Sequence, residues 1–116
     1  MIPVYMINGF LDSGKTEFIQ YTIAQPYFQM RVKTLLIVCE EGDIEYDATL
    51  LKKSRTVMEL IEDEEDFTAK NLIELEKKHK PARILIEFNG MWNSKNVKLP
   101  WHWKLEQQIT CIDGST

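Results

Sequence analysis

The segment "NGFLDSGKTEF" (Asn8–Phe18) decides the fold class, because it holds two glycines, a lysine and a threonine at the spacing of a known phosphate-binding motif. Residues 9–16 fit the phosphate-loop pattern GxxxxGK[ST] without a gap. Glycine lets the backbone approach a phosphate closely, and successive N–H groups then bind its oxygens. In such a loop the Lys15 ammonium reaches the β- and γ-phosphates of a nucleotide, and the Thr16 hydroxyl binds Mg²⁺.

The residues on both sides of this segment support a phosphate loop over a glycine turn of no function. The short apolar run "IPVYMI" (Ile2–Ile7) predicts a buried strand before it. The run "KTEFIQYTIA" (Lys15–Ala24) places its apolar residues at helical spacing after it, and Pro26 ends that helix. A strand, a glycine loop and a helix in this order are the context that the motif requires.

Strands and helices alternate along the rest of the chain. Continuous apolar runs are typical of parallel strands that are covered on both faces, and alternation with helices indicates right-handed crossovers. We therefore expect an α/β, three-layer P-loop NTPase fold with a mainly parallel sheet of about five strands. The further elements are strands at Lys33–Glu40, Thr56–Ile61, Ala82–Phe88 and Leu105–Asp113, and a helix over Thr68–Lys80 that Thr68 caps and Pro81 stops.

A carboxylate stands where such a fold binds its ligands, beyond the carboxyl ends of the strands. In "LIEFNG", Glu87 ends a buried strand and Gly90 follows three residues later. Glu87 is expected to face the phosphate loop and to place the metal or the attacking water, while the Gly90 N–H meets the γ-phosphate. The other interpretation of Glu87 is an ordinary glutamate at a strand end.

Together, "INGFLDSGKT" and the Glu-x-x-Gly of "LIEFNG" resemble the CobW-type P-loop GTPases, a metallochaperone family. The segment "CEEGDIEYD" (Cys39–Asp47) is similar to the family's Asn-Glu-x-Gly-x-x-x-x-Asp, with Cys39 in place of Asn. The resemblance implies that Asp47 helps to hold Mg²⁺ and that GTP, or else ATP, is the nucleotide. It implies catalytic Lys15 and Glu87, metal ligands Thr16, Asp47 and Glu87, and nucleotide-binding Gly9, Asp12, Ser13, Gly14, Lys15, Thr16, Glu17 and Gly90.

The sequence also departs from the family pattern. Where many members carry Cys-x-Cys-Cys, this chain has the acidic run "EDEED" (Glu62–Asp66), which suits a hard cation or, as an exposed cluster, none. Asp12 has to point away from bound phosphates, and Glu17 is expected to face solvent. The Asn-Lys-x-Asp element that reads guanine is missing, so residues 1–116 are interpreted as the N-terminal portion of a truncated GTPase domain.

Three functions remain open. The first is Mg-dependent binding and slow hydrolysis of a purine nucleoside triphosphate, as a switch in metal delivery or metalloprotein maturation. The second is a small-molecule kinase, which needs a basic lid that the scattered Arg31, Arg55 and Arg83 do not suggest. The third is a non-catalytic nucleotide-binding or docking fragment.

The composition of the chain argues against some classes of partner. A net charge of −4 argues against nucleic acid, and no apolar run reaches the ~20 residues of a membrane span. Without a secretory signal or a disulfide framework, a cytoplasmic protein is expected, with Cys39 as a buried thiol. A metalloprotein client, a metal ion and a second copy in a homodimer remain open as partners.

The aromatic segment "PWHWKL" (Pro100–Leu105) is conspicuous. Trp101 and Trp103 alternate, so an extended segment would place both on one face, either to cover the sheet edge or to dock a partner. His102 is expected to be a surface ring, and His79 a charge at the end of a helix.

Overall fold

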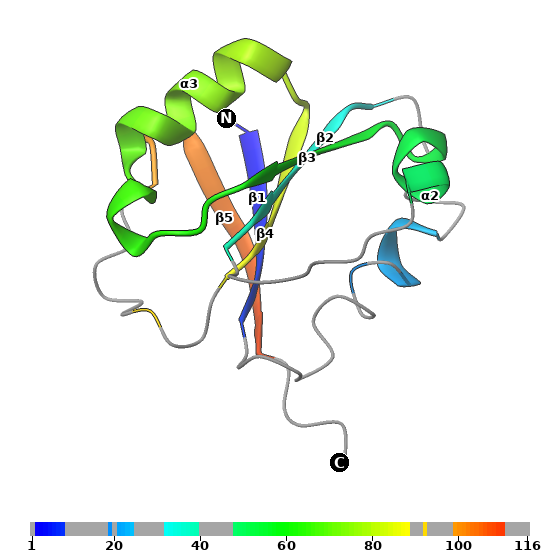
Figure 1. The fold of residues 1–116 in the computed structure, drawn as a ribbon, viewed down its shortest axis with the longest axis horizontal. Helices are drawn as coiled ribbons and strands as arrows, with labels where there is room; N and C mark the ends of the chain where they lie inside the picture. Colours follow the sequence, from blue (N-terminus) through cyan, green and yellow to red (C-terminus); the bar gives the residue numbers. More distant parts are fainter. Residues whose placement is uncertain are drawn as a thin grey trace.

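The computed structural model of the chain describes residues 2–8, 19, 21–24, 32–39, 48–88, 92 and 99–110. Its centre is a five-stranded sheet in the order β3-β2-β4-β1-β5, and every neighbouring pair is parallel (Figure 1). The predicted α/β fold with a parallel sheet is thereby confirmed. The strands are β1 (Ile2–Asn8), β2 (Thr34–Val38), β3 (Thr56–Leu60), β4 (Arg83–Glu87) and β5 (Trp103–Thr110).

The longest described helix is α3 (Ala69–His79), and its ends form as the sequence predicts. The Thr68 hydroxyl accepts a hydrogen bond from the Asn71 N–H at 3.2 Å, which caps the first turn. Lys80 adopts a left-handed conformation after the last turn, and its N–H donates to the Glu76 carbonyl. The other helical elements are α2 (Ala48–Lys53), the 3₁₀ turn η1 (Glu64–Asp66), and Ile19 with Tyr21–Ile23.

Two hydrophobic clusters cover the two faces of the sheet, as a three-layer fold requires. Successive strand residues alternate between them: Leu35 and Ile37 pack on the α3 side, whereas Leu36 and Val38 pack on the other. The second cluster includes Ile19 and Ile23 together with Leu50 and Leu51 of α2. Helices therefore lie on both faces, with α3 and α2 on opposite sides of the sheet in Figure 1.

The structure corrects the sequence analysis in three places. Helix α2 was not predicted, and β5 begins at Trp103 rather than at Leu105. The expectation that Trp101 and Trp103 share a face is wrong, because Trp101 lies in the turn before β5, where strand alternation does not apply. Trp103 is 4% exposed and packs in the core, whereas Trp101 is 86% exposed.

Candidate functional site

Glu87 is the last residue of β4, a strand that lies between β1 and β2. It pairs with Ile7 of β1 on one side and with Val38 of β2 on the other. Its side chain is 2% exposed, although a carboxylate is normally found in water. At this end of the sheet β1 leads into the predicted phosphate loop, and β1 and β4 are neighbours, as the expected position of Glu87 requires.

Backbone hydrogen bonds hold the end of β4 from both neighbours. The Cys39 N–H donates to the Glu87 carbonyl at 2.8 Å, and the Phe88 N–H donates to the Ile7 carbonyl at 2.8 Å. Both bonds continue the parallel ladders one residue past the strand ends. The Glu87 backbone is therefore fixed relative to β1, which is the requirement for a precisely placed carboxylate.

An aromatic cluster packs beside the same end of β4. The ring of Phe88 meets Phe67 and Trp92 with centroids 5.6 Å and 5.8 Å away, and both pairs are edge-to-face. Such pairs contribute about 0.5–1.5 kcal/mol beyond their buried area. The sequence analysis missed this cluster, because its members come from three separate segments and carry no common spacing.

The Glu87 side chain lies on the face opposite to these rings. Leu85 and Ile7 belong to the cluster on the α2 side, and Glu87 follows Leu85 by two residues, so alternation directs it to the same face. Ile19 and Ile23 also cover that face. The helical segment after the predicted phosphate loop thus lies on the side of the sheet that Glu87 faces.

Of the predicted site residues, Glu87 alone belongs to the described part of the chain. The remaining ones lie outside the described residues, so their predicted roles stay predictions. They are Gly9, Asp12, Ser13, Gly14, Lys15, Thr16, Glu17, Asp47 and Gly90.

The acidic run Glu62–Asp66 follows β3 and includes the turn η1. All five of its side chains are exposed, as an exposed charge cluster predicts. Within the described residues, no three His, Cys, Asp or Glu side chains are grouped so that they could hold a metal ion. Cys39 is fully buried, as expected.

Both histidines bind carboxylates. His79 lies 2.5 Å from the Glu59 Oε2 of β3, and His102 lies 2.5 Å from the Glu76 Oε1 of α3. The prediction of a surface ring is wrong for His102, since its side chain is 26% exposed and joins the turn before β5 to α3. These pairs connect α3 to both edges of the sheet.

Two of the three arginines lie at the wrong end of the sheet for a phosphate lid. Arg83 begins β4 and Arg55 precedes β3, so both stand at the amino ends of the strands, opposite to Glu87. The Arg83 Nε donates to the Thr34 hydroxyl at 2.6 Å, a contact within the sheet. Arg31 lies outside the described residues.

Comparison with known proteins identifies the family. Neither a search of curated proteins nor a search of solved structures gave a significant match. In the described residues, no helix has the length and apolarity to cross a membrane. A model of the CobW/HypB/UreG nucleotide-binding domain matches residues 3–116. The chain therefore belongs to the CobW/HypB/UreG family of nucleotide-binding domains.

Proposed function

We propose that this chain belongs to a GTPase domain that binds a purine nucleoside triphosphate with Mg²⁺ and hydrolyses it slowly. GTP is favoured over ATP by the family, and the cycle would serve as a switch in metal delivery or metalloprotein maturation. The single observation that carries the proposal is the buried Glu87 carboxylate beside the end of β1, where the GxxxxGKT segment begins.

The proposed mechanism gives each residue a physical task. Backbone N–H groups of residues 9–16 bind the phosphates, and the Lys15 ammonium offsets the negative charge that grows on them. Glu87 orients the attacking water or a ligand of the metal. The Glu87 backbone is held from both neighbouring strands, which limits the reorganisation that the side chain needs in order to act.

Mg²⁺ suits the proposed ligands. Thr16, Asp47 and Glu87 all offer oxygen atoms, which are the donors that a small hard cation prefers. The ion would neutralise charge on the β- and γ-phosphates. Glu87 stands at the carboxyl end of β4 beside the end of β1, where a ligand of this ion is expected.

The kinase alternative gains no support from the two arginines that the structure describes. A lid that closes over the phosphates must supply cations at the carboxyl end of the sheet, whereas Arg55 and Arg83 stand at the amino end.

The acidic run Glu62–Asp66 replaces the family's thiolates, so any metal that this segment binds would be a hard cation.

Single-turnover hydrolysis of labelled GTP tests this function on wild type, on Glu87→Gln and on Glu74→Gln. Glu87→Gln keeps the shape but removes the charge, and a rate at least about 100-fold lower is expected from the loss of such a group. Glu74 is an exposed residue of α3, so Glu74→Gln should hydrolyse at the wild-type rate. Equal rates in all three proteins, or label transferred to an acceptor other than water, would contradict the proposal.

A further inference from the structure

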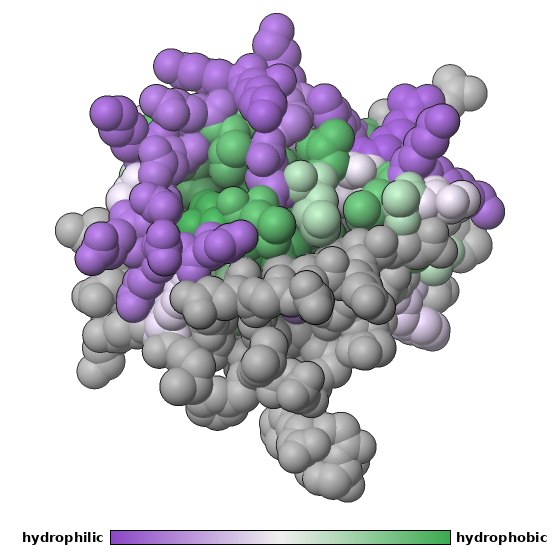
Figure 2. Space-filling model, viewed as in Figure 1, coloured by the Kyte–Doolittle hydropathy of each residue, from purple (hydrophilic) through white to green (hydrophobic). Residues whose placement is uncertain are grey.

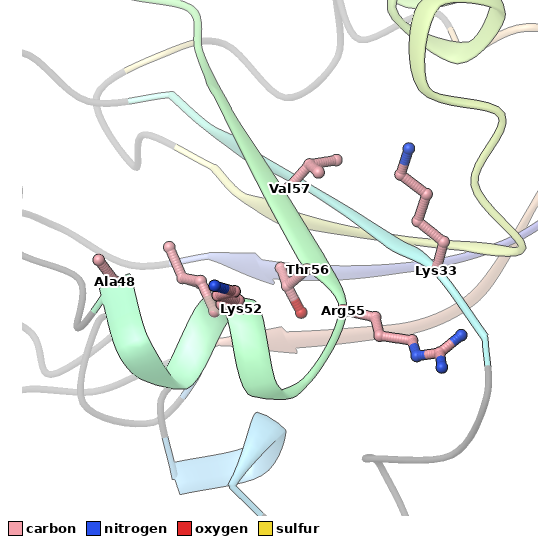
Figure 3. Close-up of a pocket in the computed structure, with 7 residues that line it drawn as sticks. Lys33, Ala48, Lys52, Arg55, Thr56 and Val57 are labelled. Atoms are coloured by element: carbon pink, nitrogen blue, oxygen red, sulfur yellow. The ribbon is translucent and has the colours of Figure 1, made fainter.

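A pocket of about 640 Å³ opens at the amino end of the sheet, around the start of β3. Its walls come from α2, from residues 55–57 and from Lys33, which precedes β2 (Figure 3). The volume falls within the range of ligand sites. Glu87 stands at the opposite end of the strands, so this pocket is separate from the proposed nucleotide site.

The pocket is cationic at its rim and apolar inside. Lys33, Lys52 and Arg55 line it, all three are exposed, and no carboxylate is among the lining residues that the structure describes. This concentration of positive charge stands out in a chain whose net charge is −4. Like charges around one pocket attract an anionic partner.

The apolar lining wraps around the edge of the sheet. Val57 packs with the cluster on the α3 side, whereas Leu51 packs with the cluster on the α2 side. Both line the pocket, together with Ala48. A space reached from both faces must lie where the sheet ends, and β3 is the outermost strand there.

The outer edge of β3 offers backbone groups for pairing. The Arg55 carbonyl accepts from the Thr34 N–H at 3.1 Å, and the Ile61 N–H donates to the Val38 carbonyl at 2.9 Å. In a parallel pair every second residue bonds to the neighbour, so Thr56, Met58 and Leu60 direct their backbone groups away from β2. Among the described residues, no strand pairs with that side.

Arg55 is held in a conformation that an arginine disfavours. Its φ is 56°, in the left-handed region at the end of α2 where glycine is the usual residue. The Arg55 N–H donates to the Lys52 carbonyl, and the neighbouring Ser54 hydroxyl bonds to the Leu50 carbonyl at 2.8 Å. Lys80 takes the same conformation after α3, so this backbone geometry ends α2 as well, and it leaves the Arg55 side chain at the pocket rim.

Charge changes sign along β3. The cationic pocket surrounds its start, while the exposed acidic run Glu62–Asp66 follows its end. Leu60, at the end of the strand, is 47% exposed, and Figure 2 shows hydrophobic surface bordered by hydrophilic side chains on the face that α3 and β3 present. A ligand of this edge should therefore carry its acidic residues at one end only.

We propose that β3 binds an extended segment of a partner protein, which adds to the sheet as a further strand. Acidic residues at one end of the segment would meet Lys33, Lys52 and Arg55, and an apolar side chain would fill the space beside Leu51 and Val57. Main-chain pairing supplies affinity in this mode, and the pocket supplies specificity. The proposal is independent of the proposed nucleotide chemistry.

Synthetic peptides test the proposal by fluorescence anisotropy. The probe is DEDVTVT with a fluorescent label, and the controls are the same peptide with lysines in place of its acids and two forms N-methylated at alternate residues. We expect the lysine peptide to bind at least about tenfold more weakly than the probe. One N-methylated form should lose binding and the other should keep it, because strand addition uses only alternate residues.

Protein variants separate the pocket from general electrostatics. Lys52 lines the pocket, whereas its neighbour Lys53 is also an exposed lysine and is not among the lining residues. We expect Lys52→Ala to weaken probe binding about fivefold or more and Lys53→Ala to change it less than about twofold. Arg55→Gly should weaken binding while raising the melting temperature, because glycine relieves the left-handed strain.

Three results would overturn the proposal. Equal losses for Lys52→Ala and Lys53→Ala would indicate unspecific charge attraction. Binding that both N-methylated peptides retain would exclude strand addition. Failure of the probe to bind would exclude the proposed partner. If a second copy of the chain fills the pocket instead, the probe also fails to bind, and sedimentation of the protein alone would reveal the dimer.

Discussion

Ile7 and Glu87 are paired in neighbouring parallel strands, and both are 2% exposed. The pairing places the end of β4 beside the end of β1, where the GxxxxGKT segment starts. The carboxylate and the predicted phosphate loop thus leave the sheet from adjacent strands. Ligands of parallel sheets are bound beyond this edge, so the geometry supports a nucleotide site there.

Removal of the metal should weaken nucleotide binding in wild type but much less in Glu87→Gln. If Glu87 helps to hold Mg²⁺, replacing its carboxylate with a neutral amide lowers the affinity of the site for the ion, so Mg²⁺ contributes less to nucleotide binding. We expect a chelator to lower the wild-type affinity for GTP about tenfold and that of Glu87→Gln less than about threefold. Calorimetric titration with and without Mg²⁺ measures both, and an identical chelator effect in the two proteins would exclude Glu87 as a metal ligand.

Trp103 should stabilise the fold through both its ring and its N–H. The ring is buried in the core on the α3 side, and the Nε1–H donates to the Glu76 Oε1 at 2.7 Å. Trp103→Phe retains much of the apolar surface but leaves that carboxylate one donor short, at a cost of about 1.5–3 kcal/mol. Trp103→Ala also creates a cavity and should cost about 3–5 kcal/mol.

Urea unfolding measures both changes in the free energy of unfolding. Trp101→Ala is the matched control, because Trp101 is 86% exposed and its removal should leave the unfolding midpoint nearly unchanged. If Trp101→Ala were as destabilising as Trp103→Ala, the described turn before β5 would be wrong.

Glu59 should make the fold sensitive to acid. The hydrogen bond from His79 lowers the pKa of Glu59 below its ordinary value of 4.5, with a further contribution from Lys78, which lies 3.2 Å away. A carboxyl group whose pKa is lower in the folded state adds stability above its unfolded pKa. That stability is lost as the pH falls from about 4.5 through the folded pKa.

Thermal unfolding between about pH 7 and pH 3 tests this linkage. Glu59→Gln cannot titrate, so we expect its melting temperature to fall less steeply below about pH 4.5 than that of wild type. Glu62→Gln, a change in the exposed acidic run, serves as the control. If the melting temperatures of wild type and Glu59→Gln fell in parallel with pH, the ion pair of Glu59 would not contribute to the acid sensitivity of the fold.

The sequence predicts the sheet well, because β1, β2 and β4 are apolar runs that polar residues end or follow. It also predicts α3, since Thr68 and Pro81 mark where that helix begins and ends. It does not predict α2, whose six residues are too few for a helical period to appear. The alternation of Trp101 and Trp103 does not place them on one face, because Trp101 belongs to a turn. Alternate residues share a face only inside a strand.

The candidate site was predictable in part, because a polar residue at the end of an apolar run can be recognised in the sequence. A glutamate at the end of an apolar run indicates the carboxyl end of a strand, so Glu87 could be located from sequence. Its two neighbours could not be derived from local pattern, because strand order is set by tertiary packing. The edge pocket was missed, since Lys33 and Lys52 lie far apart in sequence and only the fold brings them to the start of β3.

Binding of GTP and ATP to wild type and to Lys15→Ala, with Mg²⁺ present, tests the phosphate loop most directly. We predict that wild type binds a nucleoside triphosphate and that Lys15→Ala binds it at least tenfold more weakly, a loss of about 1.4 kcal/mol or more. Equal affinities of the two proteins would contradict the assignment of residues 9–16 as the phosphate-binding loop.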